Sequence, residues 1–253
     1  MNDKLKYNIK TNQNNKENTL GLQLFSSVSN PYTFTLDGNY TTNASIEAQL
    51  IDLHYYANSI LNFSTITEIP QENLDYLQSG LCATDMYGMF YGCKQLVSIP
   101  KLNIDASQCK NMYYMFRDCS SLTSIDLSNL RPSDKLKNIT SMFYKCTKLE
   151  FANLSNFNTT SITDLYQIFY YCSSLISVNL TGWDTSNVTR FNRMFMGCKN
   201  LETIEGIIDM KNCESCYQMF YDCSKLKGVK IKNPPSYLST SGMIDSSQYE
   251  IVS

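Results

Sequence analysis

The chain has 253 residues, a length that allows one large hydrophobic core or two small ones, and 43% of its residues are hydrophobic. Only 17% of the residues are charged, and 21 basic against 23 acidic residues give a formal net charge of -2. Because this balance creates no positive field that would attract phosphates or anionic lipids, we expect no nucleic-acid partner.

Residues 1–19 are polar and rich in Asn and Lys, without the apolar stretch found in secretion signals. This composition is typical of a flexible arm, or of an arm that becomes ordered on a partner and supports a multimeric assembly. The chain also has no apolar run of about 18 residues, the length that spans a membrane. If Met1 is the natural start, the sequence predicts neither a secretion signal nor membrane insertion.

Two elements are predicted between this arm and residue 80. Residues 31–40 alternate apolar and polar side chains around Asp37-Gly38, which indicates two strands joined by a tight turn. Residues 44–61 predict an amphipathic helix that covers the first repeat. The apolar side chains of this helix are Ile46, Leu50, Leu53 and Ile60. We interpret residues 1–80 as an N-terminal arm and cap, in which the single histidine, His54, has a surface or structural role.

From residue 81 onward the motif Met-Phe-x-x-Cys-x-x-Leu-x-x-Ile recurs six times with small variations, at spacings of 26, 27, 26, 26 and 25 residues. The repeat cysteines are Cys93, Cys119, Cys146, Cys172, Cys198 and Cys223. A period of this length indicates a solenoid, because one such unit cannot bury its own apolar face and must stack on its neighbours.

Each repeat combines two hydrophobic periodicities. Counted from the Met, apolar residues lie at positions -6, -3, 0, +1 and +4, which predicts a short helix with one inward face. The Leu-x-x-Ile-x-Leu segment that follows predicts a short strand. Polar segments such as residues 156–161 supply the Asn, Ser and Thr side chains that define returning turns.

These patterns predict an α/β solenoid, a leucine-rich-repeat-like array of six short helix-strand coils with N- and C-terminal caps. The array spans residues 81–231, and residues 232–253, which include Pro234-Pro235, form a C-terminal cap or tail. The segments Thr140–Leu149 and Thr185–Cys198 resemble the BspA-like leucine-rich repeats of bacterial and mycoplasmal surface proteins. The resemblance covers about residues 81–231 and implies adhesion or host-protein binding, with related repeats in phage and protist proteins. It implies no catalytic residue.

The cysteines could form a metal site or disulfides, but their positions within the repeat argue against both. Cys213-x-x-Cys216 resembles half of a zinc site or a redox pair, but both residues occupy the inward positions held by Val188 and Phe191 one repeat earlier. We therefore predict that they are small buried side chains. The repeat cysteines are predicted to form a buried column of free thiols, because helices pack about 8 to 10 Å apart whereas a disulfide needs Cα atoms within about 7 Å.

Tyrosines recur two residues before and two residues after the repeat Met, off the inward face. These eight, called the tyrosine band, are Tyr87, Tyr91, Tyr113, Tyr144, Tyr166, Tyr170, Tyr217 and Tyr221. Tyrosine combines apolar area with a polar tip and is enriched at binding surfaces, so the band is a candidate binding site. The alternative is that its rings only pack between coils.

The outward strand positions form two columns that suit a glycan- or protein-binding surface or an ordinary solvated one. One column is Asp126, Asn153, Asn179, Glu205 and Lys230, and the other is Ser98, Ser124, Ser177 and Thr203. No phosphate-binding loop or nucleophile motif occurs. We therefore predict a non-enzymatic binding or adhesion module, without cofactor or metal, that presents its repeats to a protein or glycan at the cell surface or outside the cell. The alternative is a structural component of a larger assembly, such as a virion decoration or fibre protein.

Overall fold

The computed structural model describes residues 6–10, 21–25, 50–52, 67–69, 82–238 and 247–253. The chain divides into two compact units, residues 1–47 and 48–253. In the first unit β1 (Lys6–Lys10) pairs antiparallel with β2 (Gly21–Phe25), so part of the predicted flexible arm forms a strand. The predicted strand-turn-strand at residues 31–40 lies outside the described residues, and so does His54.

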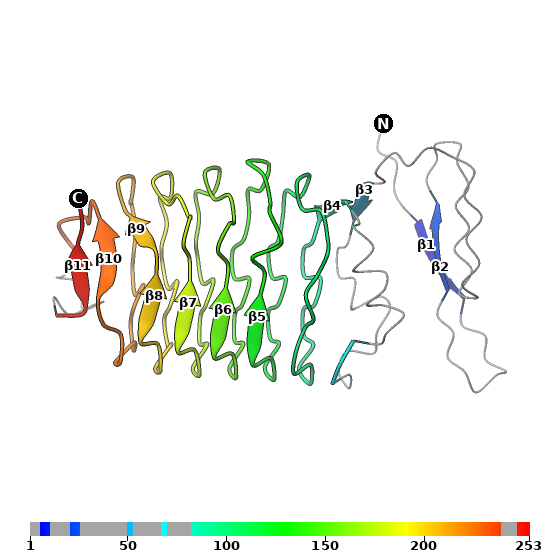
Figure 1. Ribbon diagram of the computed structural model, residues 1–253, viewed down its shortest axis with the longest axis horizontal. Helices are drawn as coiled ribbons and strands as arrows, with labels where there is room; N and C mark the ends of the chain where they lie inside the picture. The colour runs from blue at the N-terminus through cyan, green and yellow to red at the C-terminus, as the bar shows by residue number, and fades with distance from the viewer. Residues whose placement is uncertain (1–5, 11–20, 26–49, 53–66, 70–81, 239–246) are drawn as a thin grey trace. The chain divides into compact units, whose positions relative to one another are not determined.

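The second unit is a parallel β-solenoid in which one strand of each coil pairs with the next coil. The predicted helix over residues 44–61 is wrong at residues 50–52, where β3 (Leu50–Asp52) pairs in parallel with β4 (Cys82–Asp85). The main sheet contains β5 (Ser124–Asp126), β6 (Phe151–Asn153), β7 (Ser177–Asn179) and β8 (Thr203–Glu205) in sequence order (Figure 1). The central residues of these strands, Ile125, Ala152, Val178 and Ile204, are buried and in register. The predicted strand of the repeat is thereby confirmed.

The ladder continues at the C-terminal end of the array. Here β9 (Ile207–Asp209), β10 (Val229–Lys232) and β11 (Tyr249–Ile251) form a parallel sheet in the order β11-β10-β9. Residues from the predicted C-terminal cap or tail therefore add a strand to the array (Figure 1). Within the described residues, the structure has no helix long and apolar enough to cross a membrane.

The predicted helix of each repeat is wrong, because the described residues around every Met-Phe pair form successive turns. In the coil of Ile168, the N–H of Tyr170 donates to the carbonyl of Gln167, within the coil. The N–H groups of Phe169 and Tyr171 instead donate to the next coil, at 2.8 and 2.7 Å. An α-helix would bond each of these groups to the carbonyl four residues earlier. Inward side chains three residues apart therefore arise here from turns that share hydrogen bonds between coils.

Backbone dihedrals repeat the same pattern in every coil. The residue before the Met (or Ile168) and the third residue after it have positive φ, which interrupts any right-handed helix. These residues are Gly88, Gly92, Tyr114, Asp118, Ser141, Lys145, Gln167, Tyr171, Arg193, Gly197, Gln218 and Asp222. Since most of them are not glycine, the sequence contains little local signal for this conformation.

Two ladders of side chains fill the interior. The rings of Phe90, Phe116, Phe143, Phe169, Phe195 and Phe220 stack between successive coils with centroids 5.2 to 5.6 Å apart. The thiols of Cys119, Cys146, Cys172, Cys198 and Cys223 each donate to the Phe carbonyl of the preceding coil at 3.0 Å. Thus the invariant spacing of Phe and Cys reflects one stacking contact and one hydrogen bond per coil interface.

Gly206 follows β8 at a close approach between two coils. Its φ is 110°, and an added Cβ would lie 2.8 Å from the carbonyl oxygen of Leu180. We expect Gly206→Ala to lower the free energy of unfolding by about 2 to 3 kcal/mol, because backbone of the adjacent coil must move. Gly228 has φ 63° and open space around an added Cβ, so Gly228→Ala should cost only about 1 kcal/mol of backbone strain. Urea unfolding compares the two variants, and equal losses would contradict the close contact.

Candidate binding surfaces

The tyrosine band follows the turn segments of five of the six coils, and the fifth has Asn192 and Met196 at the band positions. Tyr87, Tyr91, Tyr113, Tyr144, Tyr166 and Tyr170 are half-buried, whereas Tyr217 and Tyr221 are 56% and 50% exposed. The structure adds Tyr114 and Tyr171, both at positive-φ positions, to the same row. A helical interpretation points these two rings elsewhere, which is why the sequence pattern missed them. The adjacent pairs Tyr113-Tyr114 and Tyr170-Tyr171 were the available signal.

Ring contacts connect the band across the first four coils. Tyr87 lies 5.2 Å from Tyr113, which stacks on Tyr114 at 3.6 Å. The guanidinium of Arg117 lies 4.3 Å from the rings of both Tyr114 and Tyr144 and joins two coils. Tyr144 then stacks on Tyr170 at 4.8 Å, and Tyr170 meets Tyr171 edge-on at 4.6 Å. These rings pack between coils and remain partly exposed.

Cationic side chains accompany the rings of the band. Arg190 lies 4.6 Å from the ring of Tyr166 and forms an ion pair with Asp164, and Arg193 lies 5.7 Å from the ring of Tyr217. Burial raises the pKa of Tyr113, so its hydroxyl stays protonated at neutral pH. The surface therefore combines aromatic rings and delocalised cations, groups that suit protein or glycan recognition.

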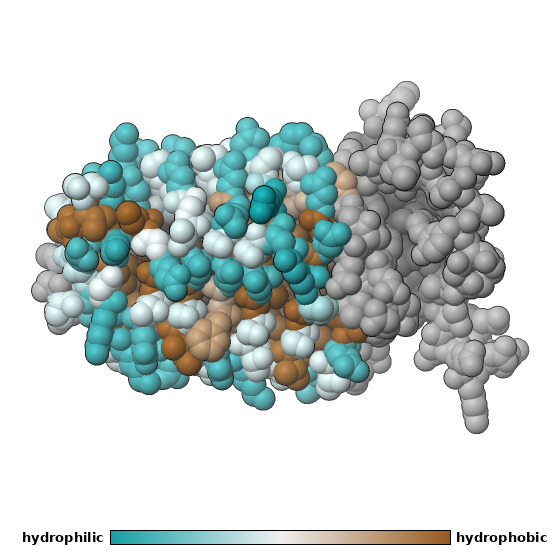
Figure 2. Space-filling model, in the orientation of Figure 1, coloured by the Kyte–Doolittle hydropathy of each residue, from teal (hydrophilic) through white to brown (hydrophobic). Residues whose placement is uncertain are grey.

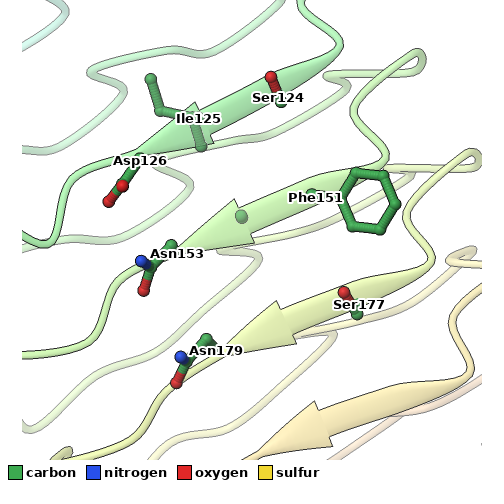
Figure 3. Close-up of a pocket in the computed structure, with 8 residues that line it drawn as sticks. Ser124, Ile125, Asp126, Phe151, Asn153, Ser177 and Asn179 are labelled. Atoms are coloured by element: carbon green, nitrogen blue, oxygen red, sulfur yellow. The ribbon is translucent and has the colours of Figure 1, made fainter. Parts of the chain in front are cut away.

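The strand face carries a depression. A depression of about 340 Å³ lies over β5, β6 and β7, and Phe151, 48% exposed, stands beside Ser124 and Ser177 at its floor (Figure 3). Phe151 occupies the column in which four other coils have Ser or Thr and the sixth has Gly228, and the sequence pattern missed it. Figure 2 shows this face as mostly hydrophilic or intermediate, with scattered hydrophobic patches.

The strand column that contains Asp126, Asn153 and Asn179 takes part in turn formation. Asp126, Asn153 and Asn179 each accept a hydrogen bond from the N–H two residues later, at 2.9, 3.2 and 2.9 Å. These Asx turns hold the chain as it leaves each strand, as the polar composition of the returning segments predicts. The backbone N–H of Ser128 lowers the pKa of Asp126, so this carboxylate stays ionised at neutral pH. The side-chain oxygens of these three residues therefore stabilise turns.

All ten cysteines are free, and nine are buried. Burial raises the pKa of Cys119, Cys146, Cys172 and Cys198, so their thiols remain protonated donors. The sequence predicts that Cys213 and Cys216 are both buried. This is wrong for Cys213, which is only half-buried. Among the described residues, no group of three or more His, Cys, Asp or Glu side chains is placed to hold a metal ion.

Comparison with known proteins identifies one family. The family model described as "Mycoplasma protein of unknown function, DUF285" matches residues 63–151 and 137–233, which together span more than half of the chain. No curated protein matches. A crystal structure of a leucine-rich repeat protein from Bacteroides ovatus matches with 14% identity over 100% of this chain and 99% of that chain, at a TM-score of 0.23.

Proposed function

The chain belongs to the DUF285 family of Mycoplasma proteins of unknown function, and on that premise we propose that it is a non-enzymatic module that binds a protein or glycan partner. The tyrosine band carries the proposal. Five of the six coils contribute at least one tyrosine to it, so a long ligand would meet aromatic groups on several coils. Stacked tyrosines lose little rotamer entropy on binding, which favours affinity.

The exposed C-terminal end of the band is the part most available to a partner. Tyr217 and Tyr221 are both about half exposed and lie on the same coil, four residues apart. Arg193 of the preceding coil approaches Tyr217, and its side chain hydrogen-bonds to Gln218 at 3.0 Å. These contacts pre-organise a cation beside an exposed ring, and we propose this end of the band as the principal contact site.

A non-enzymatic role agrees with how the repeat cysteines and the turn aspartates are used. Five repeat thiols donate to buried carbonyls, and Asp126 and Asp164 accept backbone hydrogen bonds within Asx turns. We propose that the module works at the cell surface or outside the cell. This placement comes from the resemblance to BspA-like repeats.

Binding to printed arrays of defined glycans and purified matrix proteins tests the proposal. We expect wild-type binding to at least one array and a loss of about 10-fold or more in the Tyr217→Ser/Tyr221→Ser double variant, because central aromatic contacts dominate binding energy. Both rings are half exposed, so the melting temperature should stay within about 2 °C of wild type.

The matched control is Phe151→Ser, which removes an equally exposed aromatic side chain from the strand face. It should bind as wild type does. Loss of binding in this control alone, or no binding to either array, would contradict the assignment. A stable oligomer in sedimentation velocity that persists in the tyrosine variant would instead support the assembly alternative.

A further inference from the structure

Cys213 ends a column of inward side chains. The same register position is held by Cys109, Leu136, Ile162 and Val188 in earlier coils, all of them fully buried between neighbouring coils. Cys213 lies in the last of the six repeats, and its thiol is covered instead by Tyr237, a residue that is itself 39% exposed. The Tyr237 hydroxyl lies 3.9 Å from Cys213 Sγ and donates to the Cys213 carbonyl at 3.4 Å. The end of the array therefore leaves this one cysteine accessible.

A second thiol follows Cys213 closely in the chain. Cys216 lies three residues later and is 1% exposed. A hydrogen bond with the Cys216 thiol, aided by the Tyr237 hydroxyl, lowers the pKa of Cys213 to about 7, although burial and the Glu214 carboxylate act in the opposite direction. The same bond and burial raise the pKa of Cys216. At neutral pH the accessible sulfur thus has substantial thiolate character, while the buried sulfur keeps its proton.

We propose that Cys213 and Cys216 form a thiol–disulfide exchange site, with Cys213 as the nucleophile, Cys216 as the resolving thiol and a low-molecular-weight disulfide as co-reactant. The Cys213 thiolate attacks one sulfur of the disulfide, forms a mixed disulfide and releases one thiolate. Cys216 then loses its proton to solvent and attacks Cys213 Sγ, which releases the second thiolate and leaves the Cys213–Cys216 disulfide. Two electrons pass to the co-reactant, which becomes two thiols.

The repeat thiols provide an internal contrast. Cys119, Cys146 and Cys172 are 0% exposed, and each donates to a carbonyl of the neighbouring coil. Their sulfurs are neither accessible nor ionised at neutral pH, so they should not exchange while the array is folded. The proposal concerns the last repeat alone and does not depend on the binding function.

The experiment follows the release of thionitrobenzoate when the native full-length protein reacts with the aromatic disulfide dithionitrobenzoate, together with intact mass. We expect about two rapid equivalents per chain and a product that has lost two hydrogens and retains no reagent. Cys216→Ser should release about one equivalent and retain the reagent, because the resolving thiol is absent. Cys213→Ser should abolish the rapid phase.

Cys109→Ser is the matched control, because Cys109 holds the same register position with Met112, not Cys, three residues later. It should react as wild type does. The wild-type rate should rise with pH to a plateau with a midpoint near the Cys213 pKa of about 7, and the midpoint should move upward in Cys216→Ser. A rapid phase that survives in Cys213→Ser, or a wild-type product that keeps the reagent, would overturn the proposal.

Discussion

Leu175→Asp is expected to abolish the cooperative unfolding transition of the whole coil array. Leu175 is 0% exposed, and its N–H donates to the carbonyl of Cys172 at 3.0 Å. The substitution removes a buried Leu, worth about 1.5 to 3 kcal/mol, and adds an unpaired carboxylate to the core. A total loss above about 5 kcal/mol matches or exceeds the stability of many domains of this size. Circular dichroism during heating measures the transition.

The array should fail as a unit, because each coil is stabilised by contacts with its two neighbours. Ser174→Asp is the control, since Ser174 adjoins Leu175 but is partly exposed. We expect it to change the free energy of unfolding by less than about 0.5 kcal/mol. Unchanged melting of Leu175→Asp would refute the inward register of the repeat leucine.

The stacking of the repeats was predictable from sequence because the Phe, Cys and Leu positions recur in every repeat. Ile125, Ala152 and Val178 lie in register on adjacent strands, as the period-two segment after the repeat Leu predicts. The helix was not a safe inference, because helices and consecutive turns both place inward residues three and four positions apart. What distinguishes them is where each N–H donates, as at Phe169, whose partner lies in the next coil. Spacing alone carries no information about that partner.

The candidate surface was predictable in part for the same reason. The offsets of Tyr87, Tyr144 and Tyr170 placed them correctly off the core, since that inference needs only the inward register. The roles of Tyr114 and Tyr171 depend on left-handed backbone at their own positions, which no residue preference marks. The partial exposure of Cys213 depends on the end of the array, where a side chain loses the neighbour that buries its equivalents.

Phe169→Ala should be the second most damaging change. Phe169 is 0% exposed and stacks between Phe143 and Phe195, with centroids 5.2 and 5.3 Å away and rings within 4° of parallel. Truncation removes contacts at two coil interfaces and leaves a cavity, so we expect a loss of about 3 to 5 kcal/mol in urea unfolding. Phe169→Leu keeps most of the volume but loses the stacking, and should cost about 1 to 2 kcal/mol.

Phe151→Ala controls for the loss of an aromatic side chain as such. Phe151 is 48% exposed on the strand face, so its removal should cost less than about 1 kcal/mol. The order Phe169→Ala, Phe169→Leu, Phe151→Ala follows from the position of each ring. If the leucine variant were as unstable as the alanine variant, ring stacking and not volume would dominate the interior. Equal losses at positions 169 and 151 would show that the phenylalanine ladder does not hold the coils together.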